Sequence, residues 1–157
     1  MEDQKVLREH LLELLEGRSA HIDLETAIRA FPINRINDRP DASPHTAWEI
    51  LEHIRITLSD IAEFCVNGSH VSPDFPEGYW NKEFGTAIDW QTSSEQIFAD
   101  MQRMRDIVTD ESIDLFAKIP HGIGQTYCRE VLLAADHNSY HLGQLMLLKK
   151  ILENINW

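Results

Sequence analysis

Residues 131–152, VLLAADHNSYHLGQLMLLKKIL, decide the architecture expected for this chain. The stretch contains no proline and one glycine, Gly143, and its apolar flanks predict one long buried helix. Within it, DHNSYHLGQL at residues 136–145 places polar groups where an apolar core is expected. Burying such groups without partners costs about 1–3 kcal/mol each, so something must satisfy them. A metal ion is the partner that this pattern suggests.

Two histidines of this stretch share one helical face. His137 and His141 are four residues apart, so their imidazoles lie one turn apart and can chelate a single cation. Two ligands are too few, and a third must come from a facing helix. The best candidate is His53, in the middle of HTAWEILEHIRI at residues 45–56. Together the three histidines are the predicted metal ligands.

Ordinary structural roles compete with metal binding at these positions. A histidine within a helix is more often a hydrogen-bonded core residue than a ligand, and eight histidines in 157 residues make chance spacing common. Polar neighbours shift the balance toward a metal: these are Asp136, Asn138, Ser139, Tyr140 and Gln144. Metal-bound imidazoles donate their other N–H to an acceptor, for which Gln144, Glu52 or a helix carbonyl are the expected partners.

Three nearby titratable residues are not expected to be ligands. His45 precedes His53 by eight residues, about 12 Å along a helix, so the two cannot ligate the same ion, and a capping or surface role is expected. His121 either returns near the mouth of the helical bundle or is exposed. Asp136 points about 100° away from His137, as a cap, surface or dimer residue would.

Helical periodicity recurs in five segments. The first is expected from Glu2 to Glu16, ended by Gly17, and the second from an N-cap at Asp23 to Pro32. The third is expected to start with Ser43 as N-cap and Pro44 after it, and to end at a left-handed terminator formed by Asn67 and Gly68. A capping box of Ser93 and Gln96 is expected to open the fourth, and Thr126 is expected to cap the fifth, which runs to about Glu153. Residues 69–93 form a long irregular connection, and no convincing strand pattern occurs. We therefore expect a single domain over residues 1–157, an all-α four-helix bundle with a long crossover.

The charge balance restricts the partners. Fourteen Lys and Arg residues against 26 Asp and Glu residues leave a net charge of −12, with no basic cluster to neutralise phosphates. Neither nucleic acid nor an anionic membrane is an expected partner. The first segment has charges at every turn, which is typical of an amphipathic helix and not of a signal peptide or membrane span, so a cytoplasmic location is expected.

Three motifs occur in the order typical of a known family. They are WEILEHI at residues 48–54, PEGYW at residues 76–80, and Thr126-x-x-x-Glu130 followed by DHNSYHLGQ at residues 136–144. In this order they resemble the DinB-like (DinB/YfiT) superfamily, and the resemblance covers nearly the whole chain.

The resemblance implies both an architecture and a metal site. The implied fold is an up-down-down-up four-helix bundle with a long crossover, often assembled as a homodimer. Its three-histidine site binds a divalent metal, commonly zinc or nickel, and falls by motif on His53, His137 and His141. Characterised relatives include transferases that join low-molecular-weight thiols, such as bacillithiol or mycothiol, to small electrophiles, and thiol-dependent isomerases.

The expected function is therefore metal-dependent transfer of a low-molecular-weight thiol to a small electrophile. Two alternatives stay open: a non-catalytic, metal-stabilised dimeric bundle that binds a ligand or partner, and a metal hydrolase that uses no thiol. Structural zinc is saturated by protein ligands whereas catalytic zinc keeps an open position, so a fourth protein ligand would favour the non-catalytic bundle over an enzyme. No catalytic role is assigned beyond the ligands. The crossover aromatics Tyr79, Trp80 and Trp90 are expected either to line the pocket or to pack in the core.

Overall fold

The regular secondary structure of the described part of the chain is helical, as expected. The computed structural model describes residues 2–17, 20–41 and 43–153. Its α-helices are α1 (Glu2–Glu16), α2 (Leu24–Arg29), α3 (Ala47–Val66), α4 (Ala87–Thr109) and α5 (Tyr127–Leu152), with short 3₁₀ turns at Ile33–Arg35 and Glu77–Tyr79. The described residues contain no strand beyond an isolated bridge between Lys118 and Thr126. The all-α expectation is confirmed for these residues.

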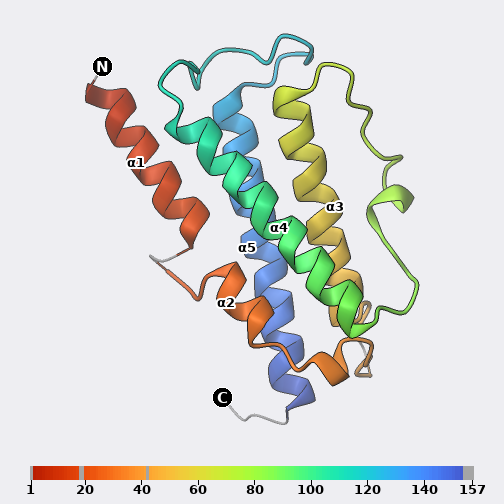
Figure 1. Ribbon diagram of the computed structural model, residues 1–157. Coiled ribbons are helices and arrows are strands. Elements are labelled where there is room, and N and C mark those ends of the chain that lie inside the picture. Colours follow the sequence, from red (N-terminus) through yellow and green to blue (C-terminus); the bar gives the residue numbers. More distant parts are fainter. Residues whose placement is uncertain (1, 18–19, 42, 154–157) are drawn as a thin grey trace.

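The long helices α3, α4 and α5 lie side by side, and α1 and α2 cover one side of them (Figure 1). α3 and α4 run in the same direction, so the connection between them descends the full length of α3 before α4 begins. α5 returns in the opposite direction against α3. Fully buried side chains from these three helices form the centre of the core, and they include Leu51, Ile54, Leu58, Ile97, Met104, Val131 and Leu145.

Several helix boundaries follow the predicted capping residues. Gly17 has a φ of 67° and its N–H bonds the carbonyl oxygens of Glu13 and Leu14, which ends α1. The Asp23 carboxylate accepts from the Thr26 N–H at the start of α2. The Thr126 hydroxyl accepts from the Arg129 N–H at the start of α5.

The predicted start of α3 is wrong by one turn. Thr46, not Ser43, is the N-cap, because Thr46 and Glu49 form a reciprocal capping box that satisfies two backbone N–H groups. Ser43 instead donates its hydroxyl to the carbonyl of His45. The left-handed terminator predicted at Asn67 and Gly68 is also wrong, since Asn67 has a φ of −117° and Gly68 is not among the positive-φ glycines.

The predicted start of α4 is wrong by about two turns. The helix begins at Ala87, after a capping box between Thr86 and Asp89. Ser93 is buried within the helix and donates its hydroxyl to Glu52 of α3, 2.6 Å away. The irregular crossover is correspondingly shorter, and α2 likewise ends at Arg29, ahead of the predicted Pro32.

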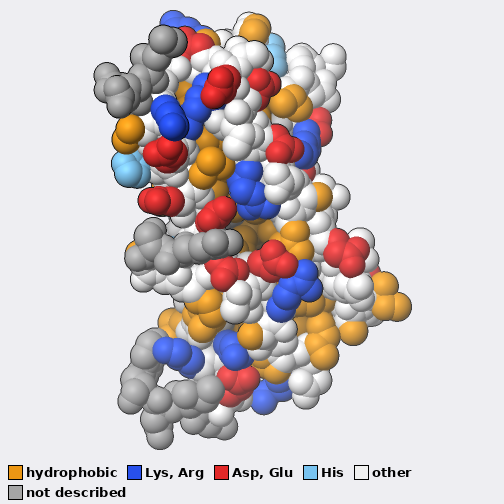
Figure 2. Space-filling view, turned by 60° about the vertical axis from the view of Figure 1, so that its left-hand side comes forward, with side chains coloured by type: hydrophobic (Ala, Val, Ile, Leu, Met, Phe, Trp, Pro, Cys, Tyr) orange, Lys and Arg blue, Asp and Glu red, His pale blue; other side chains and the backbone are white. Residues whose placement is uncertain are grey.

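Charged residues are mixed over the face of the molecule that carries α1 and α2. Figure 2 shows Lys and Arg side chains interspersed with Asp and Glu over the described part of this face. No described helix combines the length and the apolar composition that crossing a membrane requires.

The end of the crossover packs tightly on Trp48. Gly85 exchanges two hydrogen bonds with the Asn37 side chain, and a Cβ at Gly85 would lie 2.3 Å from the buried Trp48 ring. We expect Gly85→Ala to lower the free energy of unfolding by about 1–3 kcal/mol, because the ring must shift in a packed core. Urea denaturation measures the change.

Gly143→Ala is the matched control, because nothing lies within 4 Å of a Cβ at Gly143. Gly143 is exposed within α5, so alanine there should raise stability by about 0.5–1 kcal/mol. Equal stabilities of the Gly85 variant and the wild type would contradict the packing described.

Candidate metal centre

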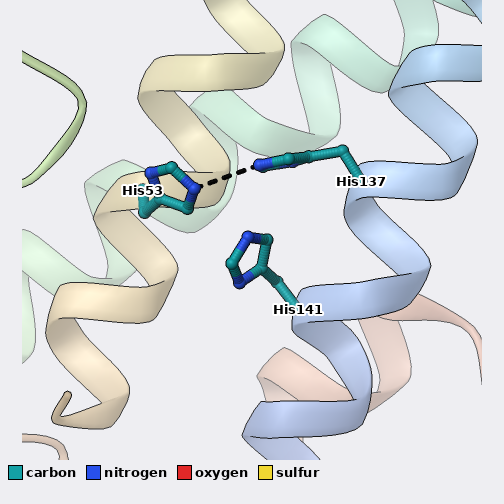
Figure 3. A group of neighbouring side chains, drawn as sticks. All are labelled: His53, His137 and His141. Atoms are coloured by element: carbon teal, nitrogen blue, oxygen red, sulfur yellow. Dashed lines mark hydrogen bonds between the residues drawn. The ribbon is translucent and has the colours of Figure 1, made fainter. Parts of the chain in front are cut away.

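The three predicted histidines come together between two helices. His53 lies in the middle of α3, and His137 and His141 project toward it from successive turns of α5 (Figure 3). One ring nitrogen from each lies within 4.8 Å of the others. His53 Nε2 and His137 Nε2 are 3.1 Å apart. This geometry could hold one metal ion.

The outer nitrogens of two rings are fixed by oxygen acceptors. His53 Nδ1 lies 2.8 Å from the carbonyl oxygen of Tyr79, which only accepts, so Nδ1 carries the proton. His141 Nδ1 lies 2.8 Å from Gln144 Oε1, and because an amide oxygen only accepts, this Nδ1 also carries the proton. In neutral imidazoles this leaves the Nε2 lone pairs facing the centre, as ligation requires.

His137 is held differently. Its Nδ1 is buried and has no hydrogen-bond partner among the described residues. Its Nε2 faces the Nε2 of His53, a contact in which one nitrogen must donate and the other accept. A bond from His137 Nε2 to a cation would replace this contact with His53, because a ligating Nε2 carries no proton. Three neutral imidazoles suit zinc, nickel, copper or iron.

Burial keeps the cluster uncharged near neutral pH. Burial, followed by the proximity of His141 and His53, lowers the pKa of His137 to about 4. Burial also lowers the pKa of His141 to about 4, although the bond to Gln144 opposes the shift. The pKa of His53 is lowered mainly by burial. All three rings are therefore neutral, so a cation does not compete with imidazolium formation, and ligation by His137 Nε2 requires its proton to move to Nδ1.

The crossover closes the site beside His53. Trp80 is stacked between two imidazoles, with ring centroids 4.0 Å from His53 and 3.9 Å from His45. His45 also approaches Glu49 at 3.6 Å and lies outside the ligand group. Trp90 packs in the core against Phe31, with ring centroids 5.4 Å apart. Of the crossover aromatics, Tyr79 lines the pocket and Trp80 covers the candidate ligand His53.

A pocket of about 610 Å³ opens over the histidines. Apolar and aromatic side chains form much of its wall, with Arg129, Asp60 and Asp136 at polar positions. The other lining residues are His53, Thr57, Ile61, Phe75, Tyr79, Leu133, His137, Tyr140 and His141. Its volume lies in the range of sites for small organic molecules.

The outer partners of the ligands are only partly those expected. Gln144 does accept from a candidate ligand, His141. Glu52 does not; its carboxylate binds Arg55 and Ser93 on the side of α3 that faces α4. The Tyr79 carbonyl was missed, because a main-chain oxygen from a distant loop leaves no signal in sequence spacing. His121 is exposed and bonds the Phe64 carbonyl through Nε2.

Comparison of the chain with protein-family models, with curated proteins and with solved structures finds no match.

The buried neutral imidazoles predict acid sensitivity of the metal-free protein. The pKa values of His137 and His141 are about 4 when folded, against 6.5 for an ordinary histidine, so between these values the unfolded chain binds more protons. The stability contribution is complete above pH 6.5 and is lost as the pH falls toward 4. Urea denaturation at pH 7.5 and 4.5 measures this loss.

His137→Gln should reduce the loss between these two pH values by about 1–2 kcal/mol. The loss of unfolding free energy between pH 7.5 and pH 4.5 is measured for each protein separately, so the contributions of titratable groups present in both proteins cancel when the two losses are compared. Equal losses in the variant and the wild type would show that His137 is not buried as a neutral ring.

Proposed function

We propose that this chain binds one divalent metal ion through His53, His137 and His141 and uses it to transfer a low-molecular-weight thiol to a small electrophile. The observation that carries the metal site is the convergence of three ring nitrogens within 4.8 Å. The Nδ1 bonds of His53 and His141 to oxygen acceptors support it, because they direct lone pairs inward. Zinc or nickel is the metal proposed.

The fold that we propose is the up-down-down-up bundle of the DinB-like superfamily, formed by α1, α3, α4 and α5. The chain directions support it, since α1 and α5 run opposite to α3 and α4 (Figure 1). The long connection between the parallel helices α3 and α4 is the crossover that this topology needs. The motif order supports membership, and with it a homodimer in the cytoplasm.

The chemistry proposed divides between the metal and the chain. A bound divalent cation supplies Lewis acidity, which lowers the pKa of a thiol or water coordinated to it. The three imidazoles add no negative charge and so leave the cation's charge undiminished. Apolar walls around the histidines exclude water and give a small electrophile a place to bind. The chain's own part is ligation, orientation and exclusion of water.

The number of ligands favours catalysis over a structural role. Within the described residues, the group of His, Cys, Asp and Glu atoms placed to share a metal contains the three histidines and no fourth member. Structural zinc sites are closed by four protein ligands, whereas catalytic sites keep a position open. This observation favours an enzyme over the non-catalytic binding bundle.

Metal analysis of untagged protein tests the site. Wild-type protein loaded with zinc or nickel and then desalted should retain close to one ion per chain, measured by elemental analysis. His137→Ala should weaken metal affinity by at least about tenfold, because two ligands hold an ion far less well than three. His10→Ala is the control, since His10 is exposed on α1. Retention below about a tenth of an ion per wild-type chain would contradict the proposal.

A thiol panel tests the reaction. Metal-loaded protein is incubated with one generic electrophile and either a thiol or no thiol, and the products are separated by mass. Thioether formation that needs both the metal and a thiol is the expected result, and it should fall at least about tenfold in His137→Ala. A product formed from water when no thiol is present would contradict thiol transfer and indicate a metal-dependent hydrolase.

A further inference from the structure

A carboxylate outside the ligand group ties the crossover to α3. Asp60 lies seven residues, about two turns, beyond His53 on α3. Its Oδ2 accepts from the Tyr79 hydroxyl at 2.7 Å, and its Oδ1 lies 2.7 Å from His70 Nε2. The side chains of Asp60 and His70 are 15% and 18% exposed, so these bonds are sheltered from solvent. One carboxylate therefore holds the crossover at two points, nine residues apart.

Tyr79 connects this anchor to the histidine cluster. Its hydroxyl is held by Asp60 and its carbonyl oxygen lies 2.8 Å from His53 Nδ1. Both ends of one residue are thus fixed to α3, on either side of the turn that carries Thr57. A carbonyl placed in this way accepts only from the Nδ1–H form of His53.

The tautomer of His53 determines whether it can ligate. Neutral imidazole carries its proton on either nitrogen, and a hydrogen bond to one nitrogen selects the form. If the Tyr79 carbonyl moved away, His53 would also populate the Nε2–H form, whose lone pair faces away from His137 and His141. Partners of this kind commonly change metal affinity by 10–100-fold.

We propose that Asp60 is a positioning residue of this site: by holding the Tyr79 hydroxyl it keeps the Tyr79 carbonyl against His53 and so sets the inward lone pair of that ligand. Its relevance to metal binding rests on the proposed function. The geometric part, from Asp60 through Tyr79 to His53, holds in the metal-free protein. Asp60 touches neither the ligand atoms nor the cation position, and it acts through the crossover.

The experiment reads the His53 tautomer directly. Nitrogen-15 chemical shifts of histidine ring nitrogens distinguish the Nδ1–H and Nε2–H forms, and they are recorded on metal-free protein at pH 7.5. Tyr79→Phe removes only the hydroxyl and keeps the ring and the carbonyl. Asp60→Ala removes the anchor itself. Tyr127→Phe is the matched control, a hydroxyl deletion at the first residue of α5, which takes no part in the hydrogen bonds that link Asp60, Tyr79 and His53.

A single Nδ1–H form is expected for His53 in the wild type and in Tyr127→Phe, and a mixture of both forms in Tyr79→Phe and Asp60→Ala. A merely structural role would lower the melting temperature of these variants without changing the tautomer. The proposal is overturned if the wild type already shows the mixture, or if Tyr79→Phe retains the single form. Should Asp60→Ala not fold, Tyr79→Phe alone decides.

Metal affinity separates this proposal from the proposed function. Zinc Kd is measured by competition with a chromophoric chelator, and Tyr79→Phe is expected to raise it about tenfold, with Tyr127→Phe unchanged. A tautomer change with no zinc binding by the wild type would overturn the metal function and leave the positioning role intact. Tight zinc binding with an unchanged tautomer and Kd in Tyr79→Phe would overturn the positioning role alone.

Discussion

The packing of α3 against α5 is the interaction on which the site depends. It brings a histidine from one helix to within 3.1 Å of a histidine from the other, and it partly shields these rings from water. Apolar burial around the rings supplies the free energy that keeps them close, since Ile54 and Ala134 beside them are almost completely buried. The same burial disfavours the charged imidazolium. The proximity and the neutrality of the rings are therefore consequences of one helix contact, whereas the inward lone pairs of His53 and His141 depend on Tyr79 and Gln144.

The parts of the structure that were predictable from sequence are those governed by short, regular spacings. The four-residue separation of His137 and His141 fixes their common face whatever surrounds the helix. Thr126 and Asp23 cap helices through local hydrogen bonds, and Gly17 ends one through its own backbone conformation. His53 was identified from its place in a second apolar helix, and the cluster in Figure 3 contains it.

The remaining features depend on competition or on long-range contact, which local pattern cannot resolve. Ser43 and Thr46 are both acceptable N-caps, and Thr46 is used because Glu49 completes the reciprocal box. Ser93 resembles a cap but is drawn into the helix by its bond to Glu52, 41 residues away in sequence. The Tyr79 carbonyl and the Trp80 ring reach His53 only because the crossover descends along α3. The path of the crossover is set by tertiary packing, which local sequence spacing does not encode.

The stacking of Trp80 on His53 places a fluorescent side chain beside the candidate metal site. Its indole lies at van der Waals separation from two imidazoles, one of them a candidate ligand, whereas Trp48 and Trp90 are enclosed in the core. An excited indole in such contact transfers its energy or an electron readily to a neighbouring open-shell cation. Binding of a paramagnetic ion would therefore quench the fluorescence of Trp80, so that this indole would report occupancy of the metal site.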